Sequence, residues 1–352
     1  MRLSDTRFLL AWLLPMLTLF GLVTLPAYAF VFTLLTWWGL ALIDSLVPGA
    51  QTSPPAVPDG TSLAYFSWVL RLFVPLQLTL IAVGAYVVMA ADWWLVVGLA
   101  FSVGFISGSQ GITFAHELGH SKSKFDRFCA WVLMTSVCYG HFMVEHYRGH
   151  HPRAATTDDP ASARYGESLY RFLPRSLLGS LVSGWSLEAQ RLVQMKRSWR
   201  DSPLLWSAVA SVGMLVAGIF MPFIAVSQAQ YAQAATKVVA FLVLQAAFAF
   251  LLLEMVNYIE HYGLQRKNEQ SRREAFGMMH AWNADHVATN SLLANLQRHS
   301  DHHMHAWKPY ATLQPLPGPQ LPTGYAGCLI LVMFPPVWFR LMHPRIEALR
   351  AA

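Results

Sequence analysis

The sequence predicts an all-α, polytopic membrane protein with about six transmembrane helices and a helical cap on the cytoplasmic side. Three observations predict it: the composition, six long apolar stretches and the distribution of basic residues. Of the 352 residues, 55% are hydrophobic and only 12% are charged, which is about half the charged fraction usual in soluble domains. So few charged side chains cannot cover a soluble protein of this size.

Six stretches approach the roughly 20 apolar residues that a helix needs to cross a bilayer. They are residues 8–26, 29–47, 68–90, 94–115, 203–226 and 237–257. Two further apolar runs, 128–144 and 325–342, are expected to lie at the membrane interface or as re-entrant segments. The first of these is short, and the second carries Pro335 and Pro336 at its centre.

The start of the chain imitates a secretory signal peptide. Arg2 and Arg7 precede an apolar core, and small residues follow at Ala27 and Ala29, as in a cleavable leader. Because a second apolar run begins at once with Phe30, a short membrane hairpin is the more economical interpretation.

The basic residues predict the orientation. With a cytoplasmic N-terminus, every one of the 25 Lys and Arg residues except Arg71 and Lys237 falls in a cytoplasmic segment. Arg71 then marks the inner end of the third span, and only Lys237 lies outside. The positive-inside rule therefore favours this topology. We expect a single membrane domain of residues 1–352, with cytoplasmic segments at 116–202 and 258–323.

The net charge of +6 does not indicate a nucleic-acid partner, because the basic residues are scattered and the chain contains 13 Trp. Nucleic-acid-binding surfaces concentrate their basic residues. The three cysteines, Cys129, Cys138 and Cys328, show no CxxC spacing. They predict neither a disulfide framework nor an iron–sulfur or zinc-ribbon site, so a redox centre in this chain must use other ligands.

All fourteen histidines except His343 lie in the two polar segments. The first cluster ends the fourth span, where His116 and His120 are four residues apart. That spacing places both imidazoles on one face of a helix, about one turn apart, where they can bind one metal ion.

A second cluster repeats this spacing with His146 and His150. The adjacent His151 is expected to point in a different direction and to serve a second metal. In the third cluster, His299, His302 and His303 have i, i+3, i+4 spacing, which predicts convergence on one helical face.

A ninth candidate, His261, ends the sixth span. Nine ring nitrogens exceed what one metal can use and suit two ions with open positions, for which iron, copper and zinc are all compatible. For the isolated histidines a structural, hydrogen-bonding role is the simpler expectation. These are His141, His280, His286, His305 and His343.

Two other classes compete with a redox enzyme. Residues 116–120 satisfy H-E-x-x-H, the zinc-peptidase signature in which the Glu acts as general base. A peptidase needs only one further ligand, however, and would leave two clusters unexplained. A metal transporter would place its ligands along a transmembrane path at mid-depth, whereas these histidines gather at the inner membrane edge.

Three boxes of the forms HxxxH, HxxxHH and HxxHH resemble the membrane fatty acid desaturase and hydroxylase superfamily. Within it, residues 116–120, 145–151, 257–264 and 296–303 look like the signatures of the alkane 1-monooxygenase family. The likeness continues outside the boxes, over roughly residues 30 to 345. It includes Trp37-Trp38-Gly39 with Asp44, Phe125-Asp126-Arg127, Tyr139-Gly140-His141-Phe142, Asp159-Pro160-Ala161, Gly166-Glu167-Ser168, Ala281-Trp282-Asn283 and Leu321-Pro322-Thr323-Gly324-Tyr325.

The resemblance implies a non-haem di-iron enzyme that hydroxylates the terminal C–H bond of medium-chain alkanes with dioxygen. It implies that the nine clustered histidines bind two irons and that no other residue is catalytic: His116, His120, His146, His150, His151, His261, His299, His302 and His303. It also implies electrons from a separate rubredoxin with its NAD(P)H-dependent reductase. Hydroxylation of methyl groups on aromatics and a lipid desaturase or hydroxylase activity stay open as alternatives.

One departure from the family follows the last box. Family members usually show a Pro-Thr-Arg stretch there, and this chain has Ala306-Trp307-Lys308-Pro309. The departure puts local contacts in doubt but not the ligands.

Further roles are predicted around the centre. Glu117, Glu145, Glu260 and Asp301 stand beside ligands in the sequence and are candidates to orient the imidazoles through the second ring nitrogen. Trp37 and Trp38, in the second span, could set the length of an apolar substrate channel. An acidic redox partner would be attracted to basic residues, for which the candidates are Lys122, Lys124, Arg127, Lys196, Arg197 and Arg200.

Overall fold

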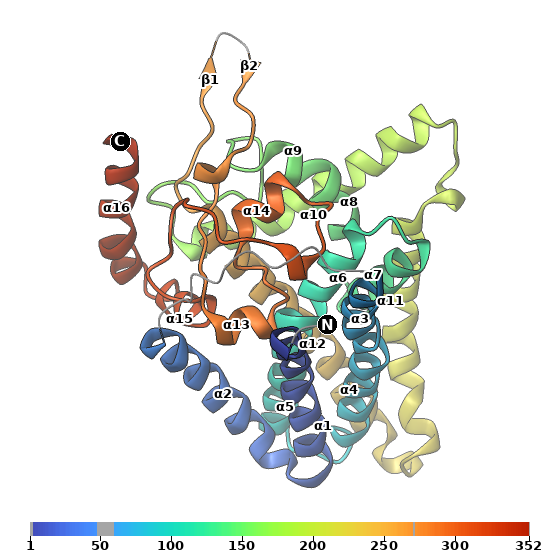
Figure 1. Ribbon diagram of the computed structural model, residues 1–352. Coiled ribbons are helices and arrows are strands. Elements are labelled where there is room, and N and C mark those ends of the chain that lie inside the picture. Colours follow the sequence, from blue (N-terminus) through green and yellow to red (C-terminus); the bar gives the residue numbers. More distant parts are fainter. Residues whose placement is uncertain (1–2, 48–59, 270–271, 352) are drawn as a thin grey trace.

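The computed structural model describes residues 3–47, 60–269 and 272–351 (Figure 1). These residues form helices joined by short connections. A two-residue antiparallel hairpin of β1 (Asn268–Glu269) and β2 (Arg272–Arg273) is the only sheet among them. The predicted all-α class is therefore confirmed, with this small hairpin as an addition that projects from the cap in Figure 1.

Long helices, several of them in consecutive segments, form the lower half of the molecule in Figure 1. They are η1 (Leu3–Trp12) with α1 (Leu13–Thr24), α2 (Pro26–Leu46), α3 (Gly60–Arg71) with α4 (Phe73–Val87), α5 (Trp93–Ile106) with the π-helical η2 (Ser107–Gly111) and α6 (Ile112–His120), α11 (Pro203–Phe220) with η5 (Met221–Ile224), and α12 (Gln228–His261).

The cap consists of shorter helices, apart from the 26-residue α10. Its elements are α7 (Lys124–Ser136), α8 (Phe142–Glu145), the π-helical η3 (His146–His150), α9 (His151–Arg153), α10 (Leu169–Gln194), η4 (Trp199–Asp201), η6 (Met278–His280), α13 (Val287–Leu292), α14 (His299–Met304), η7 (Tyr310–Thr312), α15 (Tyr325–Leu331) and α16 (Pro335–Ala351).

Six helices among the described residues are long and apolar enough to cross a membrane, which confirms the predicted number. They are Thr6–Thr24, Pro26–Leu46, Leu63–Val87, Trp93–His120, Pro203–Ile224 and Gln228–His261. The last begins nine residues before the predicted span at 237, because the polar positions around Gln228 do not interrupt the helix. The two doubtful apolar runs form broken helices and are not among the six.

The fourth candidate span is the centre of the bundle. Within its most apolar window 78% of residues are buried, against 22% for Pro203–Ile224. The apolar side chains of such outer helices are therefore exposed on the surface of the bundle, where lipid can contact them. Glycines allow the central helix to approach α12 closely: a Cβ built at Gly104 would lie 2.6 Å from the carbonyl oxygen of Gln245. Small residues at helix crossings are typical of membrane bundles.

Both helices that carry histidines out of the bundle run in the same direction. The fourth span ends at His120 and the sixth at His261, so the C-terminal ends of both helices lie under the cap. The 34 residues of α12 correspond to about 51 Å at 1.5 Å per residue. This exceeds the roughly 30 Å hydrocarbon core, and the helix therefore has length to extend beyond it.

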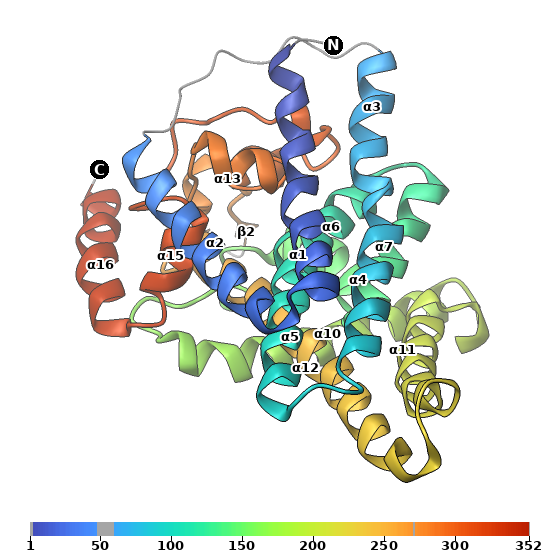
Figure 2. The same cartoon turned by 90° about the horizontal axis from the view of Figure 1, so that it is seen from below.

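The N-terminal end of the first span lies on the cap side as well. Arg7 donates a hydrogen bond from Nη2 to Asn295 Oδ1 over 2.9 Å, which links the first span to the segment before α14. The first two helices pack against each other as a hairpin (Figures 1 and 2). Viewed from below, α1 also lies beside α4 and α5.

The glycine contacts give a prediction about stability. In Gly104→Ala the added methyl group must displace backbone of α12, so we expect a loss of about 1–3 kcal/mol, as for other overpacked sites. Gly39→Ala is the matched control, since no atom lies within 4 Å of its added Cβ. Thermal unfolding in detergent measures both. Equal unfolding temperatures for the two variants would contradict the proposed packing.

Candidate metal centre

The structure brings all nine clustered histidines together between the bundle and the cap. They form two groups, and within each group one potential ligand atom per residue lies within 4.8 Å of all the others. The first group has five members: His116, His120, His146, His151 and His302. The second has four: His150, His261, His299 and His303.

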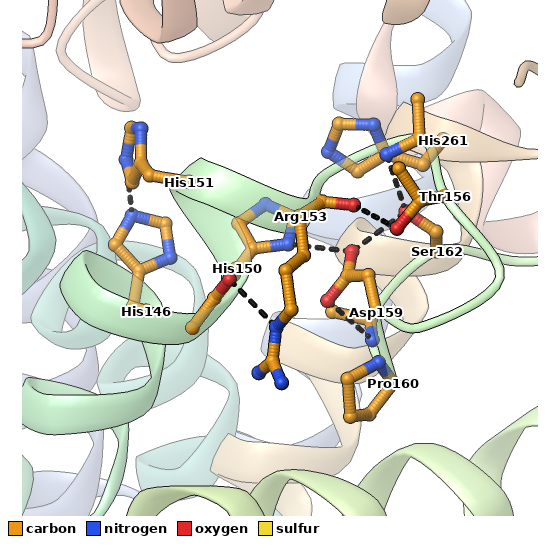
Figure 3. Close-up of polar contacts among 12 residues, drawn as sticks. His146, His150, His151, Arg153, Thr156, Asp159, Pro160, Ser162 and His261 are labelled. Carbon is orange, nitrogen blue, oxygen red and sulfur yellow. Dashed lines mark hydrogen bonds and ion pairs between the residues drawn. The ribbon is translucent and has the colours of Figure 1, made fainter. Parts of the chain in front are cut away.

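In the first group two rings approach each other through their Nε2 atoms. His146 Nε2 and His151 Nε2 lie 3.0 Å apart, and Figure 3 shows the two rings facing each other. The Nε2 atoms of His116, His120 and His302 are buried without a hydrogen-bond partner.

The second group repeats this arrangement. His261 Nε2 and His299 Nε2 lie 3.2 Å apart, and both ring nitrogens of His303 are buried without a partner. The groups are neighbours, because the ring centroids of His151 and His303, one from each group, are 4.4 Å apart.

These contacts fit a metal ion in each group. Metal–imidazole bonds of about 2.0–2.1 Å place two adjacent ligand nitrogens about 3 Å apart, close to the separations of the two facing pairs. A buried polar atom without a partner costs about 1–3 kcal/mol, and each group contains such atoms. A bound cation would satisfy them together.

Burial keeps most of the cap imidazoles neutral. For five of these rings, burial lowers the pKa well below the ordinary value of histidine, and neighbouring imidazoles lower it further. They are His146, His151, His299, His302 and His303. Since metal ligation requires the neutral ring, protons would compete little with a cation for these groups.

The histidines of the second box are distributed between the two groups differently from the prediction. His146 and His151 share the first group and His150 joins the second, whereas the sequence pattern paired His146 with His150. The reason is local: residues 146–150 form a π-helix, whose i→i+5 hydrogen bonds widen the turn. The wider turn brings His151, five residues after His146, back near the helix face of His146.

The third box also divides, contrary to the predicted convergence on one face. His299 and His303 belong to the second group and His302 to the first. Consecutive residues of an α-helix diverge by about 100°, so the rings of His302 and His303 point to different groups. The first box behaves as predicted, with His116 and His120 in one group.

Of the four carboxylates predicted to orient imidazoles, only Glu260 approaches a ligand ring. Its Oε1 lies 3.2 Å from His299 Nδ1, without hydrogen-bond geometry, and accepts a 2.8 Å hydrogen bond from the Tyr325 hydroxyl. Tyr325 belongs to a motif that the sequence reasoning noted without assigning it this contact.

The prediction is wrong for Glu117, Glu145 and Asp301, whose contacts lie elsewhere. Glu117 accepts from the Tyr310 backbone N–H, Glu145 from Arg153, and Asp301 from Lys308. A carboxylate next to a histidine on a helix points about 100° away from it and does not reach its ring. The contact of Glu117 also removes it from the general-base position of a zinc peptidase.

A carboxylate that the prediction missed orients His150. Asp159 Oδ2 lies 2.9 Å from His150 Nδ1, and Ser162 Oγ donates to the same oxygen over 2.6 Å (Figure 3). Burial opposes charge on both partners, yet their attraction raises the pKa of His150 and lowers that of Asp159 to about 2. The Asp159-Pro160-Ala161 motif was the available signal, but spacing alone gave it no partner.

The isolated histidines stay outside both groups, as predicted, among the residues that the structure describes. His343 Nε2 lies 2.9 Å from the Tyr262 hydroxyl, and His305 Nδ1 lies 2.7 Å from Asp301 Oδ1. The backbone oxygen of His280 lies 3.3 Å from His261 Nδ1, so it touches a ligand ring through its main chain.

A cavity leads to histidines of both groups. Its lining is mainly aliphatic and aromatic and includes the rings of His116 and His146 from the first group and His299 from the second. Trp37 is buried in its wall and donates from Nε1 to Ala326 O over 3.0 Å. The expectation for Trp38 is wrong: it is 57% exposed, because adjacent helix positions face different directions.

The comparisons with known proteins agree with this architecture. The family model of fatty acid desaturases matches residues 92–327. The chain is 39% identical over 325 residues to the alkane 1-monooxygenase of Ectopseudomonas oleovorans, covering 89% of this chain and 77% of that protein. For the alkane 1-monooxygenase 2 of Pseudomonas aeruginosa, identity is 34% over 320 residues, covering 88% and 81%. The xylene/toluene monooxygenase hydroxylase component of Pseudomonas putida is 26% identical over 251 residues, covering 70% and 63%.

The desaturase match and the six membrane-compatible helices define a multi-pass membrane oxidoreductase with a histidine-rich centre. Within that class, the chain belongs to the alkane 1-monooxygenase family. The resemblance predicted from the histidine boxes is thereby confirmed, together with the monooxygenase class of the enzyme.

The contact between Asp159 and His150 gives a second prediction. Removing a partner that orients a metal ligand typically lowers metal affinity 10- to 100-fold, so Asp159→Ala should weaken binding at the second group by about this factor, and Asp159→Asn by less. Chelator competition, followed by metal analysis, measures the affinity. Glu117→Gln is the control, since its contact is to Tyr310. Equal losses in the Asp159 and Glu117 variants would refute the assigned role.

Proposed function

We propose that this protein is a non-haem di-iron monooxygenase that converts medium-chain alkanes to 1-alkanols with dioxygen and electrons from rubredoxin. The observation that carries the proposal is the apolar cavity whose wall includes histidines of both groups. The comparisons support the substrate class, because several relatives that cover most of the chain are alkane 1-monooxygenases.

The cavity suits an alkane because an alkane offers nothing polar to recognise. Binding must come from burial of apolar surface, worth about 25 cal/mol per Å². Leu40, Phe105, Leu252, Val256 and Leu296 line the cavity and supply such surface from helices α2, α5 and α12 and from the segment before α14. Substrate dissolved in lipid would reach a cavity of this kind from the membrane.

The reaction balances with two electrons and two protons. One oxygen atom of dioxygen enters the C–H bond as hydroxyl, and the other leaves as water. Two irons held by the two histidine groups would supply the activation of dioxygen, chemistry that side chains cannot perform themselves. Zinc fits the ligands but not the reaction, since it has no redox chemistry.

The remaining residues position and insulate. The neutral imidazoles provide the ligand nitrogens, with Asp159 orienting His150. The Tyr325 hydroxyl, hydrogen-bonded to Glu260, lines the same cavity as His299 and can hold a proton near the reacting end of the substrate. The apolar wall keeps bulk water away from the C–H bond.

The orientation belongs to the same proposal. The cap and the start of the first span lie on one side of the bundle, and the basic residues favour the cytoplasm for that side. A cytoplasmic cap in a bacterial inner membrane would give soluble rubredoxin and its NAD(P)H-dependent reductase access to the centre.

The product profile tests the proposed function. Whole cells that express this chain with a rubredoxin and its reductase receive octane, dodecane, p-xylene and a fatty acid under ¹⁸O₂. We expect ¹⁸O-labelled 1-alkanols from the alkanes, detected by gas chromatography and mass spectrometry. Cells with His302→Ala are the control, because one ligand of the first group is then missing.

Other products would overturn the proposal in defined ways. Benzylic alcohol alone would assign the chain to the chemistry named for its xylene/toluene relative. Conversion of the fatty acid alone would indicate a lipid desaturase or hydroxylase. No labelled product from an iron-loaded protein would refute the monooxygenase reaction on these substrates.

The two adjacent tryptophans give a prediction about chain length. Trp37→Ser enlarges the cavity at a buried wall position, so we expect oxidation of alkanes longer than the wild-type limit. Trp38→Ser changes an exposed side chain of the same type and should leave the limit unchanged. The product profile over a series of alkanes measures both limits. An unchanged limit in Trp37→Ser would remove Trp37 from the substrate channel.

A further inference from the structure

A second hollow reaches the metal centre from the surface of the cap. His120 of the first group lies in its wall. We call it the basic groove and define it by Leu63 and Phe66 of α3, Lys122, and Trp307 and Lys308 after α14. It differs from the apolar cavity, whose wall contains other histidines.

The exposed charge of the basic groove is positive. Both acidic residues in its wall already have partners. Asp126 is buried and pairs with Arg71 over 2.6 Å, and the half-buried Glu117 accepts from the Tyr310 backbone over 2.9 Å. Lys122 is exposed, and Lys308 keeps 21% of its side-chain surface in solvent. An acidic protein therefore finds a complementary surface here, without exposed carboxylates among the described lining residues.

Trp307 gives this surface an anchor. Its side chain is 73% exposed, although tryptophan normally buries its large apolar area, and exposed tryptophans of this kind dominate binding in many interfaces. It stands in the stretch that departs from the usual family sequence, so the departure lies on the surface and not among the ligands.

The groove is also coupled to the metal helix. Lys308 Nζ donates to Asp301 Oδ1 over 2.8 Å, and Asp301 lies on α14 between His299 and His302. A protein seated on Trp307 and Lys308 would thus be fixed relative to the helix that carries ligands of both groups, with the half-buried His120 ring facing the same hollow.

We propose that the basic groove is the docking site of the electron donor, an acidic iron–sulfur protein that carries one electron. The proposal rests on the proposed function, because a monooxygenase reaction consumes two electrons for each dioxygen. Two docking events supply them: in each, the donor is oxidised by one electron and the metal centre is reduced by one. The two protons come from solvent.

Binding of oxidised rubredoxin to the full, iron-loaded chain in lipid nanodiscs tests this site. Microscale thermophoresis at several salt concentrations gives Kd. We expect Trp307→Ala to raise Kd about tenfold or more, as for a central interface tryptophan. Lys122→Glu should raise Kd at low salt and flatten its dependence on ionic strength.

Two matched controls lie on another surface of the cap. Trp199, 41% exposed, and Arg197, whose side chain is 62% exposed, belong to the segment around η4. Trp199→Ala and Arg197→Glu should leave Kd unchanged. The proposed site therefore departs from the sequence-based expectation, which counted Arg197 among the basic residues that attract the acidic partner. Iron content and circular dichroism of every variant confirm that the fold is retained.

Wild-type Kd values for both groove variants, an equal loss in the controls, or no binding by the wild-type chain would each overturn the docking site. The product-profile experiment tests the proposed function separately: that function fails if cells that contain rubredoxin make no labelled alkanol. A chain that makes alkanol but binds rubredoxin equally well without Trp307 retains its function and loses only this site.

Discussion

The convergence of buried imidazoles is the constraint on which the rest of the structure depends. Nine rings meet between the bundle and the cap, and several of their nitrogens are buried without a hydrogen-bond partner. Buried nitrogens without a partner destabilise the fold, and a cation bound between them would satisfy them together. The central span and α12 both end under the cap, and the cap helices place their histidines next to these two helix ends.

Two routes to this centre have opposite chemistry. The apolar cavity approaches from the bundle and exposes ligands of both groups to a hydrocarbon, whereas the basic groove approaches His120 from the cap surface. In the proposed function, separate routes would keep a charged donor out of the substrate cavity and bulk water away from the C–H bond.

Sequence periodicity predicted the parts of the structure that depend on regular geometry. The six spans and the pairing of His116 with His120 follow from apolar length and the α-helical turn. The division of the second box did not, because the π-helix at His146–His150 changes the turn. Asp159 and Tyr325 were also missed as partners, since their contacts come from tertiary packing. Between Trp37 and Trp38, only the position of neighbouring helices decides which one faces the cavity.

Metal analysis of the purified protein tests the central claim most directly. Inductively coupled plasma mass spectrometry, combined with Mössbauer spectroscopy of ⁵⁷Fe-grown protein, gives the identity and number of the bound metals. The two histidine groups predict two non-haem irons for each chain, both with nitrogen ligands, and about one remaining in a variant that lacks two ligands of one group. Stoichiometric zinc, or a single iron in fully active protein, would contradict a di-iron centre built from all nine histidines.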